Sequence, residues 1–208
     1  MSPVRRAAVL VALLALVPLP GCTGDSSSSS SSPTATRAVD AGTPLSDVDT
    51  SSLVVRREPF CDLVDPAAVT RALGEEASDA SAHRSGQRTH ITDDVTDVVH
   101  EFGCTWTAGG SRAEAWVFVP PVTRERARTL AGLARDRAGC TAIAGAAAYG
   151  DPSAATSCRA ETGIEVSYRG LFGDAWLACA LTAPGGEQEE LTERAGRWCA
   201  AVATAAAG

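Results

Sequence analysis

The spacing of hydrophobic residues changes several times after residue 58, and each spacing predicts a different element. Around Val69, apolar residues recur at helical intervals behind an Asp65-Pro66 pair, which is a typical helix start. Two later stretches repeat the helical spacing. We therefore predict three helices: Asp65–Leu73, a second that Thr123 caps and Gly139 ends, and a third that follows Pro184–Gly186.

Five segments between these helices have the spacing of strands. In one of them Ile164, Val166 and Tyr168 alternate with polar residues, as in a half-buried strand. Residues 75–96 are polar and predict a long loop. Strand groups separated by helices favour an α+β domain, here an antiparallel sheet of about five strands with three helices packed against it. The predicted strands are Phe102–Thr107, Ala113–Val119, Thr156–Glu161, Gly163–Arg169 and Ala175–Thr182.

The amino terminus has the pattern of a secretory signal peptide. A positive start is followed by an apolar run over 7–17, which is too short for a membrane span of roughly 20 residues. Leu19-Pro20-Gly21-Cys22 then resembles a bacterial lipobox, in which the cysteine receives diacylglycerol and becomes the first residue. Cys22 is thus the predicted lipidation site, and two or three acyl chains would hold the protein at the membrane. The alternative is an ordinary secreted protein with a chance cysteine.

Residues 23–57 lack periodic hydrophobicity and include the serine run 26–32, so they predict a flexible tether. Leu53–Val55 could form a short edge strand at the end of this tether. The predicted organisation is a signal peptide over 1–21, the lipidated cysteine and Ser-rich tether over 22–57, and a single extracytoplasmic α+β domain over 58–208.

Without Cys22 an even number of cysteines remains in a domain expected to be exported, which predicts three disulfides. Six cysteines allow fifteen connectivities, and we predict the sequential one. A metal or redox site is the competing interpretation, but the chain has no Cys-x-x-Cys motif and its spacings do not fit zinc. The predicted pairs are Cys61–Cys104, Cys140–Cys158 and Cys179–Cys199.

Charge and composition narrow the function classes. All 18 positive side chains are arginines, so Schiff-base and P-loop lysine chemistry are excluded. The formal charge of −7 becomes −9 once the signal peptide, with its two arginines and no acidic residue, is removed. We therefore expect no binding to nucleic acid and no electrostatic attraction to anionic membranes.

No catalytic signature is present: there is no Gly-x-Ser-x-Gly, no His-Glu-x-x-His and no glycine-rich phosphate loop. His90 with Asp93 and Asp94 could hold a metal, but a polar, solvated loop is the favoured interpretation, and we predict no metal and no cofactor. Leu171 and Phe172 lie at a predicted hairpin tip. They would form either a recognition patch or a part of the core.

Two short motifs carry a family resemblance: Phe60–Gly74, which contains Cys61, Leu63, Leu73 and Gly74, and Cys104–Trp106. Together they resemble a family of actinobacterial cell-envelope lipoproteins known only as a domain of unknown function. The resemblance implies the Cys61–Cys104 bridge and a secreted α+β domain, and it brings no enzyme activity.

These observations together predict a lipoprotein anchored through Cys22 on the outer face of the cytoplasmic membrane. We expect a non-enzymatic module that binds an envelope protein, a lipid or a wall component. The alternative is a small hydrolase that acts on wall or lipid substrates.

Overall fold

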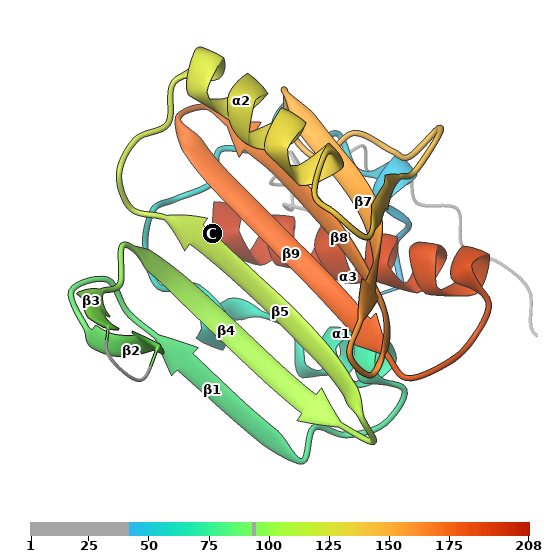
Figure 1. Ribbon diagram of the computed structural model, residues 1–208. Coiled ribbons are helices and arrows are strands. Elements are labelled where there is room, and N and C mark those ends of the chain that lie inside the picture. The colour runs from blue at the N-terminus through green and yellow to red at the C-terminus, as the bar shows by residue number, and fades with distance from the viewer. Residues whose placement is uncertain (1–41, 93–94) are drawn as a thin grey trace, which may run out of the picture. The chain divides into compact units, whose positions relative to one another are not determined.

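The computed structural model describes residues 42–92 and 95–208, without the side chains of residues 89–96. Its main feature is a seven-stranded sheet in which every pair of neighbours is antiparallel. The strand order is β1-β4-β5-β9-β8-β7-β6, and β2 and β3 form a separate hairpin (Figure 1). The strands are β1 Asp79–His83, β2 Arg88–Thr92, β3 Val95–Val98, β4 Glu101–Ala108, β5 Ser111–Phe118, β6 Cys140–Ala142, β7 Ser153–Ala160, β8 Gly163–Phe172 and β9 Ala175–Ala183.

The five predicted strands are confirmed as β4, β5, β7, β8 and β9, but the expectation of about five strands was too low. Both additional strands of the sheet lie at its edges. β1 falls within the predicted loop 75–96, because its residues are polar and mostly exposed, and only the pairing with β4 makes it a strand. β6 has three residues, too few for a period to be recognised.

The helices are α1 Pro66–Leu73, α2 Arg124–Arg135 and α3 Gln188–Ala207. The predicted caps are present: the Asp65 carboxylate accepts a hydrogen bond from the Ala67 N–H at 2.8 Å, and the Thr123 hydroxyl accepts one from the Arg126 N–H at 3.2 Å. Gly74 ends α1 with a φ of +90°. α2 stops at Arg135, earlier than the predicted end at Gly139. None of the helices in the described part is long and apolar enough to cross a membrane.

The helices cover opposite faces of the sheet. α1 and α3 pack behind it, on what we call the α3 face, and α2 crosses the other face over β7 and β8 (Figure 1). The main core lies on the α3 face, where Trp198 and Val202 of α3 meet Leu177 and Leu181 of β9. A smaller cluster beneath α2 includes Trp176. The predicted α+β class is confirmed, and its helices form two layers.

The segment 42–57 belongs to the domain, so the predicted tether extends too far along the chain. The short 3-10 helix η1 Leu45–Asp47 lies within this segment, and a second one, η2 Cys61–Leu63, follows it. Leu45 and Val55 are buried in the main core. The Arg56 N–H donates to the Ala206 carbonyl at 2.9 Å near the end of α3. Leu53–Val55 is not a strand; it runs in irregular conformation beside α3.

All three predicted disulfides are formed with the sequential connectivity. Cys61 of η2 is bonded to Cys104 of β4, and Cys179 of β9 to Cys199 of α3. The third bond, Cys140–Cys158, joins directly opposed residues of the neighbouring strands β6 and β7. β6 is one of the strands that the sequence did not predict.

Leu171 and Phe172 form no exposed patch: they are the last residues of β8, and 5% and 2% of their surfaces are accessible. Leu171 lies under α2, and Phe172 joins the main core, where its ring meets the Tyr149 ring edge to face at 5.1 Å. Leu171 and Phe172 are therefore not a recognition patch; both side chains belong to the core.

Gly170, between Tyr168 and Phe172, receives the loop that links β6 to β7. A Cβ at this position would lie 1.4 Å from the Tyr149 carbonyl oxygen, so no other residue allows the loop to come this close. The Tyr149 ring also packs against the rings of Tyr168 and Phe172, which lie on either side of Gly170 along β8. This contact holds residues 143–149 against the α3 face.

Candidate binding pocket

A cavity of about 350 Å³ opens on the α3 face, and we call it the α3 pocket. Three segments form its walls: η1 with the preceding Pro44, the loop Ile143–Ala147, and one side of α3. Tyr168 of β8 also lines it. The lining is mostly apolar or small, with a few polar groups, a composition typical of small-molecule sites. Its residues are Pro44, Leu45, Ser46, Ile143, Ala144, Gly145, Ala146, Ala147, Tyr168, Thr192, Glu193, Gly196 and Arg197.

Tyr168 supplies a polar group to the wall of the α3 pocket. Only 3% of the whole residue is accessible, and its hydroxyl has no hydrogen-bond partner among the described residues. The oxygen is not among the fully buried unpartnered atoms, so it is open to the pocket. Burial of the ring raises the pKa of the Tyr168 hydroxyl above its usual value, so the group is a neutral phenol at physiological pH. The pocket therefore contains a neutral hydrogen-bonding group that a ligand could satisfy.

Gly196 keeps this hydroxyl accessible from the helix side. It lies in the interior of α3, where glycine costs about 1 kcal/mol relative to alanine. A Cβ at Gly196 would lie 3.7 Å from the Tyr168 oxygen and 3.7 Å from Leu45 Cβ, both ordinary contact distances. Alanine would therefore fit and strengthen the helix. The glycine leaves open space between Leu45 and Tyr168 that an alanine would occupy.

The charged groups at the α3 pocket neutralise each other. Arg197 Nη1 lies 3.5 Å from Glu193 Oε2, one turn earlier on α3, and both side chains are substantially exposed. Charge pairs at this i,i+4 spacing stabilise a helix slightly. Because the two charges cancel and face solvent, the pocket offers no net charge to a ligand.

Tyr149 provides a test of the buried hydroxyls without touching the pocket. Its hydroxyl is completely buried, lacks a hydrogen-bond partner within the described residues, and does not line the α3 pocket. We expect Tyr149→Phe to raise the free energy of unfolding by roughly 1 to 3 kcal/mol, because it removes an unsatisfied polar group from the core. Urea unfolding at pH 7, followed by circular dichroism, measures this change.

The same variant has a second, pH-dependent effect. Burial raises the pKa of Tyr149 in the folded protein, whereas the unfolded chain loses this proton near pH 10. Above about pH 10 the unfolded state thus binds fewer protons, so stability falls as the pH rises. We expect this alkaline loss to be smaller in Tyr149→Phe than in the wild type. An equal loss in both proteins would contradict the assignment of the effect to Tyr149.

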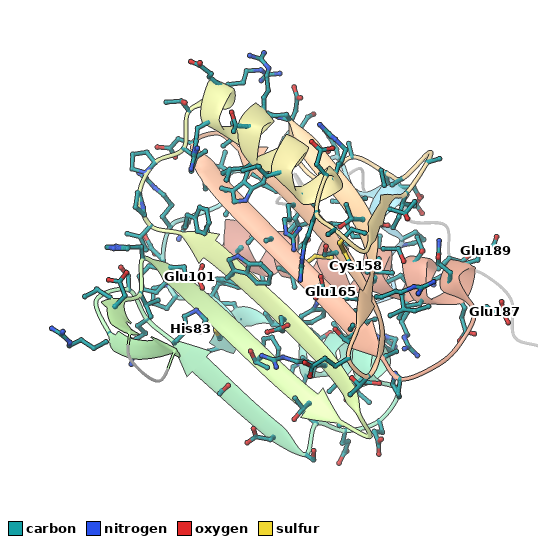
Figure 2. All side chains as sticks on the ribbon, viewed as in Figure 1. His83, Glu101, Cys158, Glu165, Glu187 and Glu189 are labelled. Carbon is teal, nitrogen blue, oxygen red and sulfur yellow. A yellow bond between two sulfur atoms is a disulfide. The ribbon has the colours of Figure 1, made fainter. Side chains whose placement is uncertain are left out.

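Two other cavities have weaker arguments as sites. A groove of about 460 Å³ between η2, α1 and Trp106 has two acidic side chains, Asp62 and Glu76, on its walls and no cation among its described lining residues. A cavity of about 510 Å³ lies beside the β2–β3 hairpin, where His83 Nε2 and Glu101 Oε1 are 3.1 Å apart. Figure 2 shows these two side chains, which come from the neighbouring strands β1 and β4.

In a hydrolase, His83 could serve as the general base and Glu101 as the acid that orients it. Such a pair also needs a nucleophile within reach. The described residues that line its cavity are His83, Gln87, Arg88, Val99 and Glu101, which include no serine, threonine or cysteine. The His83 ring lies where a Cβ of Gly103 would be, so the pair packs flat on the sheet. This arrangement supports a structural role.

A charge cluster lies on the α2 face, where Glu165 sits between two arginines. Its Oε1 is 3.7 Å from Arg137 Nη1 and 3.9 Å from Arg169 Nη2. Burial lowers the pKa of Arg169, and the nearby Glu165 charge opposes this shift. Figure 2 shows Glu165 beside Cys158 on the neighbouring strand, at the paired position of the register. The cluster holds the end of α2 over β8 by internal ion pairs.

The remaining predicted site residues lie mostly outside the described part of the chain. Cys22 and the signal peptide are among the residues that are not described. Asp93, Asp94 and the side chain of His90 also lie outside the described part. Within the ranges that the structure describes, no group of three or more potential metal ligands occurs.

The pocket residues were not singled out from the sequence. The sequence pattern indicated Tyr168 only as an inward position of a strand. It did not single out Gly196, which lies within the third helix. A glycine within a helical stripe is a known signal of close packing or function. It could have drawn attention to Gly196. The loop Ile143–Ala147 has no pattern that places it against α3.

No protein-family model, no curated protein and no solved structure matches this chain. The candidate site therefore rests on its own geometry.

Proposed function

We propose that this protein is a lipid-anchored, extracytoplasmic lipoprotein of the actinobacterial cell envelope, and that its domain is a non-enzymatic module that binds a small molecule in the α3 pocket. The observation that carries the binding proposal is the Tyr168 hydroxyl: a neutral group that has no partner among the described residues and opens into a cavity with both apolar and polar walls. The lipobox at Cys22 and the short motifs around Cys61 and Cys104 support the envelope location.

The chemistry of the pocket favours binding over catalysis. A general acid or base needs a pKa near the working pH, whereas burial moves the Tyr168 pKa further above it. Among the described residues that line the pocket there is no histidine and no cysteine. A hydrolase is the second candidate function. Its sole support is the His83–Glu101 pair, and no described residue of that cavity supplies a nucleophile.

The anchoring proposal predicts a large shift in fractionation when Cys22 is replaced. In an actinobacterial host we expect the wild-type protein in the membrane fraction, and Cys22→Ser in the soluble or secreted fraction, because a chain without acyl groups has no stable attachment to the bilayer. Intact-mass measurement should find the added diacylglyceryl group on the wild type alone. Equal membrane association of both proteins would contradict the proposal.

The pocket proposal predicts that a methyl group at Gly196 interferes with binding. We expect native mass spectrometry of the protein, purified in mild detergent from its own membranes, to detect a retained small molecule in the wild type and to find it reduced or lost in Gly196→Ala. The added Cβ would lie beside the Tyr168 hydroxyl.

Gly132→Ala is the matched control. Gly132 lies inside α2 with nothing within 4 Å of its added Cβ, so this variant gains the same helix propensity and leaves the α3 pocket unchanged. We expect it to retain the molecule. Loss of the molecule from both variants, or from neither, would count against the α3 pocket as the site.

A further inference from the structure

The ligand class follows from what the α3 pocket offers, given that the pocket is the binding site proposed above. We propose that it takes an uncharged, compact, mainly aliphatic molecule whose buried end is an oxygen acceptor, such as a ketone, an ester or an ether, hydrogen-bonded to Tyr168. Three observations support this class: the state of the Tyr168 hydroxyl, the apolar walls, and the cancelled charges on α3.

The first observation concerns the buried end of the ligand. The Tyr168 hydroxyl is a donor that no described residue satisfies, and burial raises its pKa, so it keeps its proton. A ligand oxygen that accepts a hydrogen bond from this O–H supplies the missing partner. A hydrocarbon of the same shape would leave the donor unsatisfied and would bind less well.

The second observation concerns the body of the ligand. Leu45 and Ile143 line the cavity from separate segments of the chain, and the small residues 144–147 add apolar surface. A volume of about 350 Å³ is at the lower end of the range for small-molecule pockets. The apolar part of the wall thus suits a compact aliphatic group, and the polar side chains Ser46 and Thr192 line the rest together with the Glu193–Arg197 pair.

The third observation excludes a charged end. An anion placed against Tyr168 would be buried, and the cation that lines the pocket, Arg197, is already paired with Glu193. Removing a carboxylate from water without a free cation costs several kcal/mol. A cationic end meets the same difficulty, because Glu193 is paired and exposed. The ligand is therefore neutral.

Three isosteric or near-isosteric probes test this class: cyclohexanone, methylenecyclohexane and cyclohexanecarboxylate. The protein is the chain from residue 22 onward with Cys22→Ser, labelled with ¹⁵N, and chemical-shift titration gives each Kd. We expect cyclohexanone to bind with a millimolar Kd, as its few heavy atoms allow. Methylenecyclohexane, which replaces the oxygen by CH₂, should bind about tenfold more weakly, and cyclohexanecarboxylate at least as weakly.

Tyr168→Phe and Tyr149→Phe form the matched pair of variants. Each removes one tyrosine hydroxyl, but only the first removes a group that lines the pocket. We expect Tyr168→Phe to fold normally, to bind methylenecyclohexane at least as tightly as the wild type because no donor is left unsatisfied, and to lose the tenfold preference for cyclohexanone. Tyr149→Phe should keep that preference.

The outcomes separate the ligand class from the site itself. If Tyr168→Phe keeps the preference for the ketone, or if the carboxylate binds more tightly than the ketone, the ligand class is wrong while the pocket stands. If none of the three probes shifts residues around the α3 pocket of the wild type, the pocket proposal fails, and the ligand class fails with it.

Discussion

Replacing Trp198 by alanine is expected to lower the free energy of unfolding by about 3–5 kcal/mol, the usual cost of truncating a buried tryptophan. Trp198 is among the largest fully buried side chains and packs in the main core between α3 and the sheet. Its Nε1–H donates to the Glu114 carbonyl at 3.3 Å, and its ring meets Trp106 edge to face at 5.4 Å. The truncation would leave a cavity and an unsatisfied carbonyl.

Trp116→Ala is the control for this prediction. Trp116 lies on β5 between the core residues Ala115 and Val117, so its side chain points to the opposite face of the sheet, where it is half-buried. We expect its truncation to cost less than half as much. Urea denaturation followed by far-ultraviolet circular dichroism gives both free energies. Comparable losses in the two variants would show that the α3 face is not the principal core.

The strongly periodic elements of the fold could be predicted from the sequence. All three helices and five strands were found, since each buries one side in a regular pattern, as Val166 and Tyr168 do in β8. β1, β2, β3 and β6 could not be found, and the first two lie inside the predicted loop 75–96. Residues such as Asp79 and Ser81 in β1 become a strand through hydrogen bonds to β4, which is a tertiary effect that overrides weak local preference.

The start of the domain was misplaced for a similar reason. Leu45 and Val55 are isolated apolar residues in a polar stretch, and no period marks them as buried. They are held by contacts with distant segments, such as the hydrogen bond from the Thr50 hydroxyl to the Ala148 carbonyl at 3.2 Å. The disulfides, in contrast, needed only an even count and a compartment, and their sequential pairing is confirmed.

The α3 pocket was beyond the reach of sequence patterns because it is assembled from distant parts of the chain. Leu45, Ile143, Tyr168 and Gly196 come from four separate elements or loops. The loop that contributes Ile143 is held in place by the close approach of Tyr149 to Gly170. Neither residue carries a motif, and only the folded arrangement gives the Tyr168 hydroxyl its unusual state.

Removal of the Cys61–Cys104 bond is the second change with a large expected effect. This disulfide closes a loop of 43 residues, the longest of the three, and joins η2 to the buried Cys104 of β4. In the loop-entropy model a crosslink of this span stabilises the fold by about 4 kcal/mol, because it restricts the unfolded chain. We therefore expect Cys61→Ala with Cys104→Ala to lower the free energy of unfolding by about that amount.

The double replacement of Cys140 and Cys158 by alanine is the matched comparison. Its loop spans 18 residues, for which the same model gives about 3 kcal/mol, and the backbone pairing of β6 with β7 remains without the bond. Denaturant unfolding of both variants, under conditions that keep the other disulfides oxidised, tests the order. A smaller loss for the Cys61–Cys104 variant than for the Cys140–Cys158 variant would contradict this order. It would mean that loop length does not control the contribution of these bonds. The packing of η2 and α1 against β4 would then hold that end of the domain without a crosslink.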